Sequence, residues 1–121
     1  MKKIVVILGC RVLTAFSVSA QSKINLEEVA QHMGDSVRVC GKVFGTRFLE
    51  NSNGRPTLIN MGGAYPNELL TVVIYGDDRE KFAGKPEEIC NNKNICVTGR
   101  IVTFKGKAQI IITAPEQLLI Q

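Results

Sequence analysis

The sequence predicts a small, mainly β domain: a closed barrel of five strands, with one helix before the first strand and a short helix between the third and fourth strands. Two observations favour this class. Apolar and polar residues alternate with a period of two over residues 37–43, as in a strand with one buried face. Two amphipathic stretches also carry an internal glycine, Gly41 or Gly99, in the same local pattern. A glycine inside a strand marks a bend or bulge, which a small barrel requires in order to close.

The size and composition of the chain narrow the possible classes of protein. With 121 residues, the chain has the length of one domain. Apolar residues make up 45% and charged residues 21%, which is the usage of a folded protein rather than of a disordered chain. The chain is too short for a dinucleotide-binding domain or an eightfold βα barrel. We therefore expect no enzyme built around a cofactor fold of that kind.

Residues 1–20 are expected to be a secretory signal peptide, and residues 21–121 the single mature domain. A short positive start precedes a mostly apolar region, and small residues end it at Ala20. The region is interrupted by Arg11 and is too short to span a membrane as a helix. Residues 7–10 resemble a lipoprotein cleavage box, although the apolar stretch before them is short. We expect an exported protein, periplasmic or secreted, with no membrane span after cleavage.

Removal of the signal peptide would change the charge of the protein. The whole chain has 15 basic and 11 acidic side chains, a net charge of +4. Lys2, Lys3 and Arg11 would leave with the signal peptide, so that 12 basic side chains remain against the same 11 acidic ones. A strong bulk attraction to polyanions is therefore not supported. Only the distribution of charge over the surface can favour an anionic ligand.

The mature domain is expected to begin with a helix of about two turns. Asn25 can serve as the N-cap, and Glu28 stands at the third helical position, as in a capping box. Leu26, Val29 and the residues after them place apolar side chains at helical spacing. Gly34 can then end the helix.

The remaining elements follow in chain order. Strands are expected over 37–43, 57–61, 69–75, 95–104 and 108–113. Segments 50–56 and 62–67 have the composition of loops, and 105–107 that of a tight turn. Segments 77–82 and 86–90 are expected to be short and helical, because acidic residues and a proline stand at their starts. Residues 116–121 are expected to form a turn or an extended tail.

This arrangement resembles the OB-fold, a five-stranded Greek-key barrel with a helix between strands three and four. The resemblance covers residues 36–114 and is carried by the patterns at 39–43, 104–110 and 113–118. More narrowly, the chain is similar to short exported bacterial OB-fold domains related to nucleic-acid-binding modules. The resemblance implies a ligand face on strands two and three, framed by the loops after strands one and four.

Three cysteines remain in the expected mature domain: Cys40, Cys90 and Cys96. Cys40 and Cys96 each lie an odd number of residues before the internal glycine of their strand, so both point to the same face. Because strands one and four are neighbours in an OB-fold, the resemblance implies a Cys40–Cys96 disulfide, which an oxidising compartment permits. A Cys90–Cys96 bridge and three free thiols remain as alternatives. No metal site is expected, since the only histidine is His32 and there is no C-x-x-C motif.

Aromatic and basic residues gather in the segments that the resemblance places around the ligand face. They are Arg47, Phe48, Arg55, Tyr65, Tyr75, Phe104, Lys105 and Lys107. Bases of single-stranded nucleic acid stack on aromatic rings while cations contact the backbone, so these residues predict such a ligand. The alternative for Phe48 and Phe104 is that both rings close the ends of the barrel as part of its core.

The sequence favours a binding protein over an enzyme, and we expect no catalytic residues and no cofactor. The adjacent acidic pairs at 77–78 and 87–88 direct their side chains apart. No serine or cysteine stands in a recognisable nucleophile context. We therefore expect a non-catalytic exported domain that binds single-stranded nucleic acid or an oligonucleotide. A cell-envelope module for protein interaction or saccharide binding is the alternative, and an accessory domain of a separate secreted nuclease lies between them.

Overall fold

A computed structural model describes residues 22–121 of the chain, and the predicted signal peptide lies outside them. The strands are β1 (Ser22–Ile24), β2 (Ser36–Phe48), β3 (Thr57–Met61), β4 (Leu70–Ile74), β5 (Asn94–Phe104), β6 (Lys107–Ile111) and β7 (Leu118–Ile120). The short helices are η1 (Leu26–Gln31), α1 (Gly76–Arg79), α2 (Pro86–Ile89) and η2 (Pro115–Gln117). The domain is mainly β, as the sequence predicts. No helix in residues 22–121 has the length and apolar character of a membrane span.

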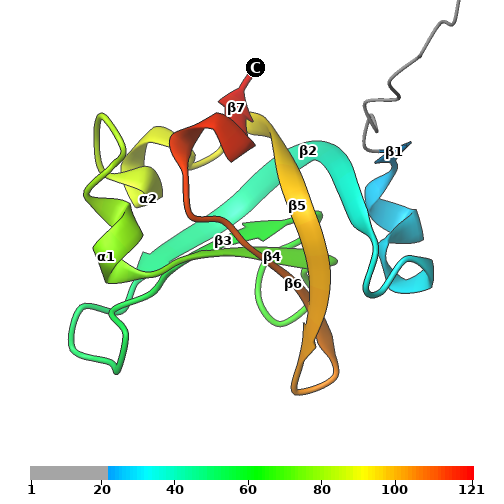
Figure 1. Ribbon diagram of the computed structural model, residues 1–121, viewed down its shortest axis with the longest axis horizontal. Helices are drawn as coiled ribbons and strands as arrows, with labels where there is room; N and C mark the ends of the chain where they lie inside the picture. The colour runs from blue at the N-terminus through cyan, green and yellow to red at the C-terminus, as the bar shows by residue number, and fades with distance from the viewer. Residues whose placement is uncertain (1–21) are drawn as a thin grey trace, which may run out of the picture.

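The strands form one mixed sheet that curls into a partly closed ring. Their order is β1-β2-β3-β4-β6-β5-β7, and β2 also pairs with β5. The pairing therefore runs from β2 through β3, β4, β6 and β5 and returns to β2. Within this circuit β4 and β6 are parallel, and the other pairs are antiparallel. Figure 1 shows α1 and α2 at one end of the sheet, and β1 with η1 at the other.

The inside of the ring is filled by aliphatic side chains. On β3, Thr57, Ile59 and Met61 are buried, whereas Leu58 and Asn60 between them are partly exposed. Other core residues come from every strand of the circuit: Val39, Val43, Leu70, Val72, Ile74, Ile95, Val97, Ile101 and Ile110. Burial of one such side chain contributes about 1.5–3 kcal/mol, so this cluster is the main source of stability. The residues that alternate with it on β3 and β6, such as Leu58, Asn60 and Gln109, are partly exposed on the outer face.

The two internal glycines allow close packing. A β-carbon at Gly99 would lie 2.6 Å from Cγ2 of Ile110, and one at Gly41 would collide with the side chain of Leu26. The register of β2 against β3 shifts further along the strand, between Val43 and Gly45. Gly41 keeps a regular register with Ile95 of β5, so of the expected bend or bulge no bulge lies at this glycine. The glycine there makes room for η1, and the irregularity comes after it.

The first helix is tighter than the sequence predicts. η1 is a 3-10 helix, and the N–H of Glu28 donates to the carbonyl of Asn25 at 2.9 Å, an i to i+3 bond. Part of the expected capping box is present, because the N–H of Asn25 donates to Oε1 of Glu28 at 2.9 Å. Only Val29 of this helix is buried. Gly34 follows with a φ of +88°, a left-handed conformation that favours glycine.

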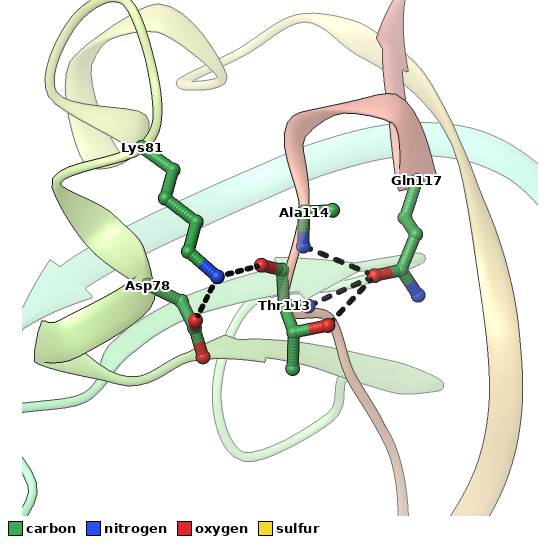
Figure 2. A network of polar contacts seen from close by, with 5 residues as sticks. All are labelled: Asp78, Lys81, Thr113, Ala114 and Gln117. Carbon is green, nitrogen blue, oxygen red and sulfur yellow. Dashed lines mark hydrogen bonds and ion pairs between the residues drawn. The ribbon is translucent and has the colours of Figure 1, made fainter.

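The segment after β6 is fastened from two sides, as Figure 2 shows. Lys81, which follows α1, donates to the carbonyl of Thr113 at 3.1 Å. Oε1 of Gln117 accepts from the N–H groups of Thr113 and Ala114 at 2.9 and 3.1 Å. The amide nitrogen of Gln117 in turn donates to the carbonyl of Thr98 in β5, at 3.0 Å. These bonds connect α1, the end of β6 and β5.

The sequence predicts neither of the two outer strands. β1 pairs with β2 in parallel, and β7 pairs with β5 in antiparallel. Each has only three residues, which is too short for a period of two to be recognised. The tail predicted at 116–121 is a short helix followed by β7. The five longer predicted strands are present, although β2 extends to Phe48 and β6 ends at Ile111.

A disulfide joins β2 to β5. Cys40 and Cys96 stand directly opposite each other in the register of the two strands, with their Cα atoms 3.9 Å apart. This is the cross-strand pairing that the OB-fold resemblance implies, and the Cys90–Cys96 alternative is wrong. Cys90 is a buried free thiol. Burial raises the pKa of Cys90 to about 11, so the thiol stays protonated and unreactive near neutral pH.

Removal of the disulfide is expected to destabilise the domain markedly. The bond joins residues 56 positions apart, so it restricts the unfolded chain over a long loop. Replacement of Cys40 and Cys96 together by alanine should lower the free energy of unfolding by about 2–4 kcal/mol, measured by chemical denaturation. A reductant should lower the stability of the wild type to that of the variant and leave the variant unchanged. Equal stability of the two oxidised proteins would contradict this role.

Candidate functional site

Three adjoining depressions form a continuous groove on the outer face of the sheet. Leu58 of β3 lines all three of them. Asn60 and Tyr65 line the first and the second, and Phe104 and Gln109 the second and the third. Further lining residues include Thr46, Arg47, Glu68, Thr71, Lys105, Lys107, Asn53, Val73 and Tyr75. We call this surface the β3 groove.

Strand alternation determines which side chains form the floor of the β3 groove. Leu58 and Asn60 alternate with the buried residues of β3, and Gln109 lies between buried Ala108 and Ile110 of β6. The hydroxyl of Thr71 donates to Oδ1 of Asn60 at 2.9 Å, which joins β4 to β3 across the floor. The floor therefore consists of an aliphatic side chain and uncharged amides.

Three connections frame the groove. They are the loop after β2, the loop between β3 and β4, and the turn between β5 and β6, which lie on one side of the sheet in Figure 1. The turn has two residues, Lys105 and Gly106, with φ values of +52° and +80°. Such values are typical of a tight hairpin turn, and they agree with the turn predicted at 105–107. Phe104 and Lys107 stand opposite each other at the base of this turn.

Exposed aromatic rings line the groove. The exposed fractions are 76% for Tyr65, 54% for Phe104 and 40% for Tyr75. Phe104 is therefore not part of the core, and its interpretation as a plug of the barrel end is wrong. Rings that remain exposed along a groove provide flat apolar surfaces on which another ring can stack.

Two cations in the groove have no ion-pair partner among residues 22–121: Arg47 and Lys105. Arg47 is exposed at the end of β2. The ammonium of Lys105 lies 5.3 Å from the centre of the Phe104 ring, close enough for a cation–π contact. An anionic group of a ligand can therefore approach a cation at two places along the groove.

The third cation of the groove, Lys107, is engaged within the protein. Its ammonium donates to Oε2 of Glu68 and to the carbonyl of Pro66, each at 2.8 Å. It also lies 5.7 Å from the centre of the Tyr65 ring. Burial of Glu68 on its own would raise the pKa of that carboxyl. The hydrogen bond from Lys107, a hydrogen bond from the backbone of Glu68 and the charge of Lys107 together outweigh burial, so the pKa of Glu68 lies below its ordinary value.

Six of the eight predicted ligand-binding residues line the groove: Arg47, Tyr65, Tyr75, Phe104, Lys105 and Lys107. Phe48 and Arg55 do not line it. The ring of Phe48 is covered by the guanidinium of Arg79, 3.8 Å from the ring centre, and Arg79 also bonds Glu87 at 2.6 Å. The guanidinium of Arg55 packs against the backbone of Gly76. Phe48 therefore packs at the end of the sheet that carries α1 and α2, and the exposed Arg55 lies beside Gly76 of α1.

Sequence reasoning missed the floor of the groove and its acidic residue. Leu58 and Asn60 occupy the outward positions of a strand that was correctly predicted, so the alternation itself could have identified them. Glu68 gave no such signal, because its partner Lys107 is 39 residues away in the sequence. Only the pairing of β4 with β6 brings the two residues together.

The comparisons with known proteins concern the fold. No protein-family model matches the chain, and no match was found among the curated proteins by sequence. Among solved structures, yeast Stn1 and Ten1 is similar with a TM-score of 0.57 and 8% identity, over 86% of this chain and 64% of that one. An aspartyl-tRNA synthetase from Entamoeba histolytica is similar with a TM-score of 0.54 and 10% identity, over 90% of this chain and 24% of that one. The chain thus spans less than two thirds of either protein, and the likeness supports an OB-like fold.

Replacement of Glu68 by glutamine is expected to make folding less sensitive to acid. The pKa of Glu68 in the folded protein lies below 4.5, so in this range the unfolded chain binds more protons than the folded one. The stabilisation by Glu68 is therefore present above about pH 4.5 and is lost as the pH falls through the folded pKa. Denaturant unfolding at several pH values should show a smaller loss of stability in acid for Glu68→Gln than for the wild type. Equal losses would contradict the ion pair with Lys107.

Proposed function

We propose that this domain binds single-stranded nucleic acid or an oligonucleotide in the β3 groove, and that it does so without catalysing a reaction. The observation that carries the proposal is the row of exposed rings, Tyr65, Phe104 and Tyr75, on a groove that also presents Arg47 and Lys105. A single strand exposes flat bases along a regularly charged backbone. Stacking of one base on an aromatic ring contributes about 1–3 kcal/mol, and cations beside the rings attract the phosphates.

The distribution of charge predicts binding in which stacking contributes more than ion pairing. Lys107 is neutralised by Glu68, so two cations remain for phosphates. The expected mature chain has almost no net charge, which limits attraction over long distances. The similarity of the fold to an aspartyl-tRNA synthetase and to Stn1 and Ten1 supports a binding role.

Export of the protein is part of the same proposal. The Cys40–Cys96 disulfide is compatible with the oxidising conditions of the periplasm or of the cell exterior. The proposal includes no catalytic role for Glu68, the acidic residue among those that line the groove. Its low pKa and its bond to Lys107 leave it unsuited to act as a proton donor near neutral pH. Incubation of the purified protein with a labelled single strand should therefore leave the strand uncut.

A cell-envelope module that binds a saccharide or a protein is the second candidate. The uncharged floor of the groove favours it, because Leu58, Asn60 and Gln109 can contact a sugar ring or a peptide as well as a base. The two candidates differ in their response to salt. Binding of an uncharged saccharide would not weaken as salt rises, whereas binding of a nucleic acid would.

Salt is expected to weaken the binding of a labelled single-stranded oligonucleotide only moderately. Each phosphate neutralised on a single strand contributes a slope of about −0.7 to the logarithm of affinity against the logarithm of salt concentration. Contacts by Arg47 and Lys105 should therefore give a total slope of about −1.4 in fluorescence anisotropy titrations. The Lys105→Ala variant should reduce the slope by about half. Binding that is independent of salt would contradict the proposal.

Loss of the Phe104 ring is expected to weaken oligonucleotide binding by about 1–3 kcal/mol, because one stacking surface is removed. Phe44→Ala is a matched control for Phe104→Ala. Phe44 is 46% exposed and has the ammonium of Lys42 at 5.3 Å from its ring centre, but it does not line the groove. Phe44→Ala should bind like the wild type in the same titration. Equal losses in the two variants would place the binding site elsewhere.

A further inference from the structure

A second surface of the sheet, on the outer side of β1, β2, β5 and β7, carries cations and no carboxylate of its own strands. The Cys40–Cys96 bond identifies the side chains on it, because paired residues and every second residue of a strand point to the same side. From these two cysteines, the register assigns to this side Lys23, Arg38, Lys42, Thr98, Arg100 and Leu119. We call this surface the basic face.

Three cations of the basic face lie close together without a counter-charge. Lys23 stands directly opposite Arg38, and Arg100 is two residues along β5 from Thr98, which pairs with Arg38. Like charges in such positions repel each other and destabilise a sheet. The five ion pairs of residues 22–121 involve none of these cations, nor Lys42. An anionic partner would therefore relieve repulsion that the described part of the chain leaves uncompensated.

Acidic residues near the ends of these strands do not pair with the basic face. They are Glu27, Glu28, Asp35 and Glu116. The carboxylate of Asp35 instead bonds Nδ1 of His32 at 3.0 Å. The guanidinium of Arg100 donates through Nε to the carbonyl of Gly34 at 3.0 Å, which holds this side chain in place without neutralising its charge.

Exposed apolar side chains accompany these cations. Leu119 is 52% exposed beside Cys96, and Phe44, which is 46% exposed, has the ammonium of Lys42 at 5.3 Å from its ring centre. A long cationic side chain can keep its charge among lipid headgroups while a neighbouring apolar group enters the acyl-chain boundary. Bases stack on rings and not on an aliphatic side chain such as Leu119, so the combination favours a lipid surface over a nucleic acid.

We propose that the basic face binds the surface of an anionic membrane. Lysine and arginine near a negatively charged lipid surface attract it, and the exposed apolar side chains add to the binding. In the ring of paired strands, β4 lies across from the β2–β5 ladder, and its outer side belongs to the β3 groove. A membrane on the basic face therefore leaves the groove accessible. The inference does not depend on which ligand the groove binds.

Cosedimentation of the protein with lipid vesicles tests the inference. The protein should partition at least about a hundredfold more strongly onto vesicles of phosphatidylglycerol and phosphatidylcholine in equal amounts than onto phosphatidylcholine alone. Replacement of the exposed Lys23 and Lys42 together by glutamine should lower this partition by about twenty-five-fold, because each cation contributes about fivefold. Replacement of Arg47 and Lys105 together by glutamine removes the same charge from the groove, and it should retain most of the binding.

The Lys23→Gln/Lys42→Gln variant should be at least as stable as the wild type in denaturant, because repulsion of Arg38 is relieved. Loss of folding would then not explain loss of vesicle binding. Equal partition of the wild type onto both kinds of vesicle, or equal losses in the two double variants, would overturn the inference and leave the proposed function in place. Oligonucleotide binding that is lost in the Lys23→Gln/Lys42→Gln variant would also overturn it, in favour of a nucleic acid on the basic face. Vesicle binding without oligonucleotide binding would overturn only the proposed function.

Discussion

The pairing of β2 with β5 is the constraint on which the rest of the structure depends. The two strands meet over seven residue pairs, from Ser36–Arg100 to Lys42–Asn94, and this ladder returns the sheet to its starting strand. The Cys40–Cys96 bond holds the register of the ladder, and Gly99 lets Ile110 of β6 approach the backbone of β5. The ring that this ladder closes carries the β3 groove, which residues of β3, β4 and β6 line.

The charge of that groove is determined by one interaction between distant parts of the chain. Lys107 of β6 holds Glu68 and the carbonyl of Pro66, so it fixes the loop between β3 and β4 against the sheet. The same contact removes one positive charge from the surface that faces a ligand. Order in the loop and low charge in the groove therefore have a common cause, and recognition is left to rings and hydrogen bonds more than to bulk attraction.

The sequence contained enough information to predict the five strands of the ring but not the two outer strands of the sheet. Alternation and the glycine pattern identified the five longer strands, because each has enough residues for a period to be visible. The three-residue strands β1 and β7 lack that length, and they exist because longer neighbours offer them a free edge. The type of the first helix was also beyond prediction. The capping pattern at Asn25 fits an α-helix as well as a 3-10 helix. The packing of Leu26 on Gly41 is a tertiary contact, which local sequence does not reveal.

Phe48 and Phe104 show why the site could be predicted only in part. Each is an aromatic residue at the end of a long strand and next to a basic residue, so composition gives them the same expected role. Phe104 ends β5 at a two-residue turn, and its ring remains exposed. Phe48 lies at the end of β2. Its ring is covered by Arg79 of α1, which is 31 positions further along the chain. A ring becomes a binding surface or a packing surface through what the distant chain places on it, and local sequence does not contain that information.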